Sequence, residues 1–69
     1  MNGFIEIKPA GGGNRRLINI RHIEEVMECE NGSCIIYFAC NAPTGIETYH
    51  IKPSQSYEEI KSKIWECRR

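Results

Sequence analysis

The dipeptide Asn31-Gly32 separates two runs of residues, 23–30 and 33–40, in which apolar side chains recur at alternating positions. Asparagine and glycine tolerate the positive φ angles of a two-residue type I′ turn better than other residues do. The dipeptide therefore predicts an antiparallel hairpin made of these two runs. A two-residue turn would set Cys29 opposite Cys34 and Met27 opposite Ile36.

This register gives the predicted hairpin two apolar faces, because side chains of a strand alternate between its two sides. Six residues are expected on the first face: Ile23, Met27, Cys29, Cys34, Ile36 and Phe38. Three others, interspersed with glutamates, are expected on the second: Val26, Ile35 and Tyr37.

Three further strands are predicted from the same alternation. Residues 4–8 and 15–20 flank a segment rich in Gly and Pro, which predicts a second hairpin, and residues 46–52 form a fifth strand. In the fifth strand Tyr49 and Ile51 share one side, and Thr48 and His50 share the other. The expected sheet is a five-stranded antiparallel meander.

The segment Ser56-Tyr57-Glu58-Glu59 matches the S-x-x-E capping box and predicts a helix that begins at Tyr57. At 100° per residue, Trp65 falls away from the apolar stripe of this helix, which comprises Tyr57, Ile60, Ile64 and Cys67. The whole prediction is an α+β fold, a five-stranded meander with one C-terminal helix, in a single domain over residues 1–69.

One short helix covers only part of one face of such a sheet, yet both faces contain large apolar residues. Either the sheet curls into a small SH3-like or Sm-like barrel, or the second face is an interface. A chain of 69 residues buries a smaller share of its surface than a larger domain does and is marginally stable alone, which favours a homo-oligomer. Six residues are the expected contacts: Phe4, Leu17, Val26, Ile35, Tyr37 and Trp65.

Charge and hydropathy exclude several classes of protein. Nine basic residues balance nine acidic ones, so the net charge of zero argues against a histone-like nucleic-acid coat. No apolar run is long enough to cross a bilayer, and the N-terminus does not resemble a signal peptide, so we expect a cytoplasmic location and no membrane partner. Charge is uneven along the chain, however, because residues 24–30 contain four glutamates and no basic residue.

The four cysteines, Cys29, Cys34, Cys40 and Cys67, lack the close pairs that are typical of zinc sites. We therefore expect free thiols that pack as small apolar groups, with no metal and no cofactor. A nucleophilic pair of Cys34 with His50 is the alternative, although no local motif supports it.

The loop at residues 11–16 is the one segment whose residue types suggest a ligand-binding site. Glycines can expose backbone amides to an anion, and arginine binds phosphate through directed hydrogen bonds. These six residues are the candidate ligand-binding site for a nucleotide or another anion: Gly11, Gly12, Gly13, Asn14, Arg15 and Arg16. The segment is not a Walker loop, since no Gly-Lys-Ser/Thr follows, and the alternative is a plain hairpin loop with solvated arginines.

Four segments resemble small bacterial proteins of the flagellar-regulator FlbD/SwrD type: residues 17–26, Asn31-Gly32, Ile51-Lys52 and residues 56–60. The resemblance covers about two thirds of the chain and extends to similar short proteins of bacteria and phages. It implies a few strands with a short amphipathic helix and no catalysis. Two functions are therefore weighed: a non-catalytic regulatory module that binds proteins and self-associates, and a small-ligand binder that uses residues 11–16. An enzyme is not expected.

Overall fold

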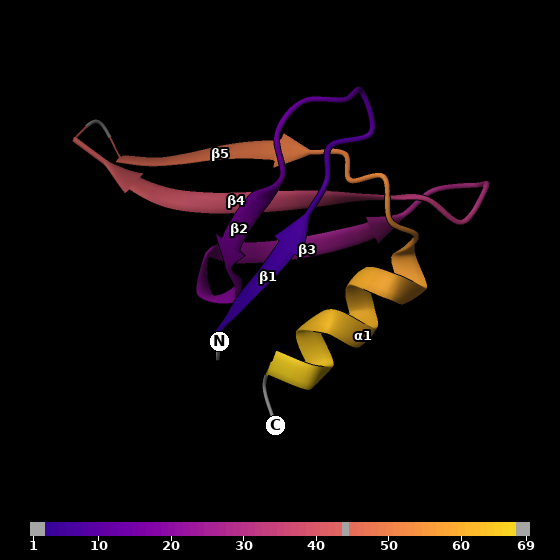
Figure 1. Cartoon of the computed structure of the whole chain (residues 1–69). Helices are drawn as coiled ribbons and strands as arrows, with labels where there is room; N and C mark the ends of the chain where they lie inside the picture. The colour runs from indigo at the N-terminus through magenta and orange to yellow at the C-terminus, as the bar shows by residue number, and fades with distance from the viewer. Residues whose placement is uncertain (1–2, 44, 68–69) are drawn as a thin grey trace.

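Two antiparallel sheets and one C-terminal helix form an α+β fold in the computed structural model (Figure 1). The structure describes residues 3–43 and 45–67, with the backbone alone for residues 40–42 and 46–47. In chain order the elements are β1 (Phe4–Ile7), β2 (Arg16–Asn19), the 3-10 turn η1 (Ile20–His22), β3 (Ile23–Glu28), β4 (Cys34–Ala42), β5 (Gly45–Ile51) and α1 (Tyr57–Cys67).

The predicted five-stranded meander is wrong, because β1 and β2 form one sheet and β3, β4 and β5 form another. The break occurs at η1. The Asn19 side chain accepts a hydrogen bond from the Arg21 backbone N–H at 3.0 Å, and the Ile23 N–H bonds to the Ile20 carbonyl. This turn redirects the chain before β3 begins, so β2 and β3 do not pair.

The two sheets meet instead through the segments that follow β1 and β5. Pro9 and Pro53 form an isolated antiparallel bridge. Beside it, the Ala10 N–H donates to the Lys52 carbonyl at 2.8 Å, and the Ser54 N–H donates to the Lys8 carbonyl at 2.6 Å. A closed barrel is not formed among the described residues, since β2 and β5 are each an edge strand.

The core lies where the β1–β2 hairpin and α1 cover one face of the three-stranded sheet (Figure 1). Ile7, Ile36 and Ile60 are completely buried and come from β1, β4 and α1. Full burial of such a side chain contributes about 1.5–3 kcal/mol. These residues join the β1–β2 hairpin, the three-stranded sheet and α1, together with the other buried members of the core, Ile5, Cys34 and Phe38.

The register of the β3–β4 hairpin differs by one residue from the predicted register. Glu28, not Cys29, lies opposite Cys34, because the turn has three residues. The Cys29 N–H donates to the Ser33 carbonyl at 2.8 Å and the Gly32 N–H donates to the Cys29 carbonyl at 3.1 Å. Gly32 alone of the turn has a positive φ, +85°, as in a type I turn closed by a glycine bulge.

This shift exchanges the faces of two residues, because one step along a strand reverses the side chain. Val26 lies opposite Ile36 and packs against the core, whereas Met27 lies opposite Ile35 and is 40% exposed. The prediction that placed Val26 on the outer face and Met27 on the inner face is therefore wrong.

The helix prediction is confirmed. The Ser56 hydroxyl accepts the Glu59 N–H at 3.2 Å, which caps the first turn of α1. Ile60 is buried, and three more residues of the predicted stripe pack against the core: Tyr57, Ile64 and Cys67. Trp65 is 68% exposed, as its position on the helical wheel predicts.

Candidate binding cleft between β2 and β5

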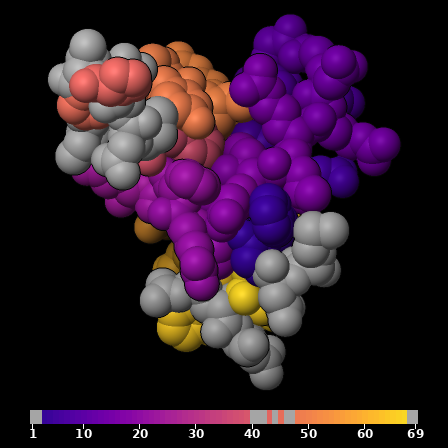
Figure 2. Space-filling view, turned by 90° about the vertical axis from the view of Figure 1, so that its left-hand side faces the viewer, coloured from indigo at the N-terminus to yellow at the C-terminus, as the bar shows by residue number. Residues whose placement is uncertain are grey.

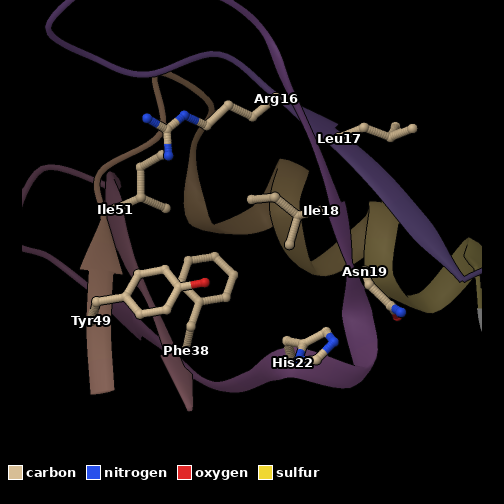
Figure 3. Close-up of a pocket in the computed structure, with 8 residues that line it drawn as sticks. All are labelled: Arg16, Leu17, Ile18, Asn19, His22, Phe38, Tyr49 and Ile51. Carbon is tan, nitrogen blue, oxygen red and sulfur yellow. The ribbon is translucent and has the colours of Figure 1, made fainter. Parts of the chain in front are cut away.

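A cleft of about 400 Å³ separates β2 from the β4–β5 hairpin. Figure 2 shows it as a notch between β5 in orange and the β1–β2 hairpin in purple. Ligand sites commonly have volumes of about 300–1,000 Å³. The cleft is lined by Arg16, Leu17, Ile18, Asn19, His22, Phe38, Tyr49 and Ile51 (Figure 3).

The cleft runs along the open edge of β2. All four residues of this strand line it, although neighbouring side chains of a strand point to opposite faces. The Ile20 N–H donates to the carbonyl of Gly3, the residue just before β1. Backbone groups of an antiparallel strand alternate in direction, so Ile18, two residues earlier, also directs its N–H and C=O groups to β1. The N–H and C=O groups of Leu17 consequently face away from β1, toward the edge that has no partner strand among the described residues.

Two stacked aromatic rings form the floor of the cleft. Phe38 and Tyr49 lie opposite each other on β4 and β5, with ring centroids 5.0 Å apart and planes inclined by 22°. Phe38 is buried, but 53% of Tyr49 is exposed. Figure 3 shows Ile18 on the opposite wall, facing these rings, while Leu17 points away from them. The floor of the cleft is therefore an aromatic surface, and about half of Tyr49 remains exposed to solvent.

The polar groups of the cleft are cationic or neutral. The Arg16 guanidinium lies beside Ile51 at one end, and His22 lies at the other end (Figure 3). No aspartate or glutamate is among the lining residues. Two other grooves, one between β1 and α1 and one beside η1 and β3, are each lined by two glutamates, Glu6 with Glu66 and Glu24 with Glu25. The cleft therefore favours an anionic group near Arg16.

The predicted ligand-binding loop contributes only its last residue to this cleft. Gly11, Gly12, Gly13 and Asn14 are exposed and do not line it. The Gly12 N–H closes a turn on the Pro9 carbonyl at 3.2 Å. Arg15 forms an exposed ion pair with Glu6 at 3.5 Å, while Arg16 enters the cleft. The two arginines therefore face different surroundings.

The six predicted interface residues lie in several places rather than on one surface. Ile35 and Tyr37 are on the outer face of β4, where Tyr37 and His50 have ring centroids 5.8 Å apart. Leu17 is 56% exposed at the cleft, Phe4 is half-buried beside α1, and Trp65 is exposed on the far side of the helix. Val26 packs against the core instead.

The thiols of the described cysteines are free, and their surroundings are those of packing groups. Burial, and secondly the neighbouring Cys29, raise the pKa of the Cys34 thiol, so it is protonated at neutral pH. Cys34 lies on the core face and His50 on the outer face of the same sheet, so the hypothetical Cys34–His50 pair is not formed. The Cys40 side chain lies outside those that the structure describes.

Among the side chains that the structure describes, no group of three or more His, Cys, Asp or Glu residues is placed to hold a metal ion. The single helix of the described residues is too short to cross a bilayer.

Sequence reasoning missed the cleft because its walls come from two sheets that were expected to be one. Alternation along β5 correctly placed Tyr49 and Ile51 on one side of the strand. Alternation along β2 likewise places Arg16 and Ile18 on one side. Nothing in the sequence shows that these two strands face each other across a gap. A free strand edge is a property of tertiary structure.

No family model matches this chain, and comparisons with curated proteins and with solved structures found no match either. The resemblance to FlbD/SwrD-type proteins stays a prediction.

Proposed function

We propose that this protein is a small non-catalytic binding module that acts through protein–protein contacts, with the β2–β5 cleft as its recognition site. The observation that carries the proposal is the open edge of β2 beside the half-exposed ring of Tyr49. An unpaired strand edge can form backbone hydrogen bonds with an extended peptide, and an adjacent apolar pocket can select its side chains.

The position of Tyr49 supports a binding role over a purely structural one. Phe38 already fills the core beneath it, so the exposed half of the Tyr49 ring adds little to folding. Aromatic residues in partly enclosed pockets are the side chains that most often dominate the energy of protein interfaces. A partner that covers this ring would remove its apolar surface from water, and this burial would contribute favourably to the free energy of binding.

A peptide display experiment tests the proposal. A library of random seven-residue peptides is selected against the whole protein, and the selected peptides are then measured against two variants. We expect Tyr49→Ala to weaken binding at least tenfold and Tyr37→Ala, on the outer face, to leave it unchanged. A library that yields no binder, or binders indifferent to Tyr49→Ala, would contradict the proposal.

Self-association is the second part of the proposal and concerns the outer face of the three-stranded sheet. This face presents Met27, Ile35 and Tyr37 without a covering layer among the described residues. Light scattering coupled to size exclusion should show a dimer or larger oligomer at micromolar concentration. The variant Ile35→Glu should return it to a monomer, whereas a wild-type protein that is already monomeric would refute this part.

An anionic small molecule is a second candidate ligand, favoured by the position of Arg16 in the cleft. Because Arg15 is paired with Glu6 outside the cleft, the two arginines should contribute unequally. A ligand raises the melting temperature of the protein that binds it. ATP or inorganic phosphate should stabilise the wild type and Arg15→Ala but not Arg16→Ala, and equal stabilisation of all three would exclude a site at Arg16.

A further inference from the structure

We infer that the occupant of the cleft is an extended peptide that pairs with β2 as an added strand and carries an apolar and an acidic side chain two residues apart. This inference rests on the proposed function and names the class of partner. The free backbone groups of β2, the spacing of its side chains and the charge of the cleft all point to this partner.

The backbone of β2 provides a docking point at Leu17. Leu17 directs both its N–H and its C=O to the open edge, since Arg16 and Ile18 pair with β1. In an antiparallel pair, the residue opposite such a position exchanges two hydrogen bonds with it. The peptide residue opposite Leu17 is therefore held by both of its backbone groups.

The side chains of β2 then set the sequence pattern of the partner. Ile18 and Arg16 lie on the same face, two residues and about 6.8 Å apart along the strand. Residues directly opposite each other on paired strands have side chains in contact. The peptide residue opposite Ile18 thus meets the aromatic floor of Phe38 and Tyr49, and the residue opposite Arg16 meets the guanidinium.

Charge decides that the second peptide side chain is acidic. The described residues contain no ion pair for Arg16, whereas Arg15 is paired with Glu6. None of the described residues that line the cleft has a carboxylate, whereas two glutamates line each of the other two grooves. A guanidinium beside an apolar floor binds a carboxylate through directed, charge-assisted hydrogen bonds. The pattern of an antiparallel partner is accordingly apolar, any residue, acidic.

The test uses three synthetic peptides that differ in one feature each. The probe is acetyl-Thr-Thr-Phe-Thr-Glu-Thr-amide, the first control moves Glu next to Phe, and the second control replaces Glu by Gln. We expect the probe to bind at least tenfold more tightly than either control, because a charge-assisted hydrogen bond accounts for about a tenfold or larger gain. Affinities are measured by isothermal titration calorimetry with the full chain.

Two protein variants locate the acidic contact. Arg16→Ala should remove the preference for Glu over Gln, and Arg15→Ala, whose side chain lies outside the cleft, should retain it. The preference should also shrink as salt is raised, because screening weakens an exposed charge pair. Equal binding of all three peptides to the wild type, or a preference that survives Arg16→Ala, overturns the inference.

A second set of measurements tests the added strand itself. Leu17→Pro removes the N–H at the open edge, where proline is tolerated in edge strands, and Leu17→Thr changes the side chain while keeping the N–H. We expect Leu17→Pro to abolish probe binding and Leu17→Thr to preserve it. If Leu17→Pro does not fold, the probe methylated at the amide of the Thr between Phe and Glu provides the same test, and undiminished binding of that peptide overturns strand addition.

These experiments separate failure of the inference from failure of the proposed function. The display library could yield peptides whose binding depends on Tyr49 but which lack the spaced acidic residue. The protein would then still be a peptide-binding module, but with a different specificity. Wild-type protein whose oligomers dissociate in Arg16→Ala would show that a second copy occupies the cleft. Either result overturns the inference that a spaced acidic partner peptide is the occupant.

Discussion

Replacing Ile60 by alanine should remove much of the stability of this protein, because Ile60 is the one residue of α1 that is fully buried. An Ile→Ala substitution in a packed core costs about 2–5 kcal/mol, from lost transfer energy and from the cavity left behind. A chain of 69 residues has a total stability of about 3–10 kcal/mol. A loss of about 3 kcal/mol would lower the melting temperature by about 12–24 °C.

Two variants of the same helix serve as controls, and urea unfolding followed by circular dichroism is the assay. Ile60→Val removes one methyl group and should cost about 0.5–1.5 kcal/mol. Trp65→Ala removes a larger side chain that is 68% exposed and should change stability by less than about 0.5 kcal/mol. If Trp65→Ala destabilises the protein as much as Ile60→Ala does, the face of α1 that packs on the sheets is not the one described above.

Three further predictions concern the turn, a buried thiol and the surface. Gly32→Ala should cost about 1–2 kcal/mol in chemical denaturation, entirely through the backbone, since φ is +85° and an added Cβ would meet no atom within 4 Å; an unchanged stability would contradict the glycine bulge. The pKa of Cys34 is raised above its ordinary value of 9.0, so the stability due to its neutral thiol is present below pH 9.0 and is lost as the pH rises through the folded-state pKa; the wild type should lose stability above pH 9.0 more steeply than Cys34→Ala, and parallel pH profiles would refute this. Arg15→Ala should cost less than about 1 kcal/mol, because the Arg15 and Glu6 side chains of this ion pair are 74% and 55% exposed, and its effect should fade at high salt; a salt-independent loss would show that Arg15 acts through packing.

The sequence alone determined the local elements, since each depends on neighbouring residues. The capping box at Ser56 and the apolar stripe through Ile60 predicted α1 from its first residue, and the exposed position of Trp65 followed from the helical wheel. Alternation located the five strands to within two residues at each end. It also paired Tyr49 with Ile51 on one side of β5.

The turn at Gly32 shows where local reasoning was insufficient. Asn31-Gly32 suits both a two-residue turn and a three-residue turn with a glycine bulge, and the two differ by one residue in register. Burial of the β3–β4 hairpin decides between them, because the observed register places Val26 opposite Ile36 on the core face. That choice depends on what covers the sheet, so it belongs to the whole fold.

The candidate site depended on tertiary structure throughout. The sequence identified Arg16 but joined it to exposed glycines, and it assigned Tyr49 to a strand face without indicating what that face would meet. The 3-10 turn capped by Asn19 separated the predicted sheet into two, and the Pro9–Pro53 bridge joined them at one end only. A cleft forms where two strand edges approach without pairing, and that approach is decided by the packing of α1 and the two sheets around Ile7, Ile36 and Ile60.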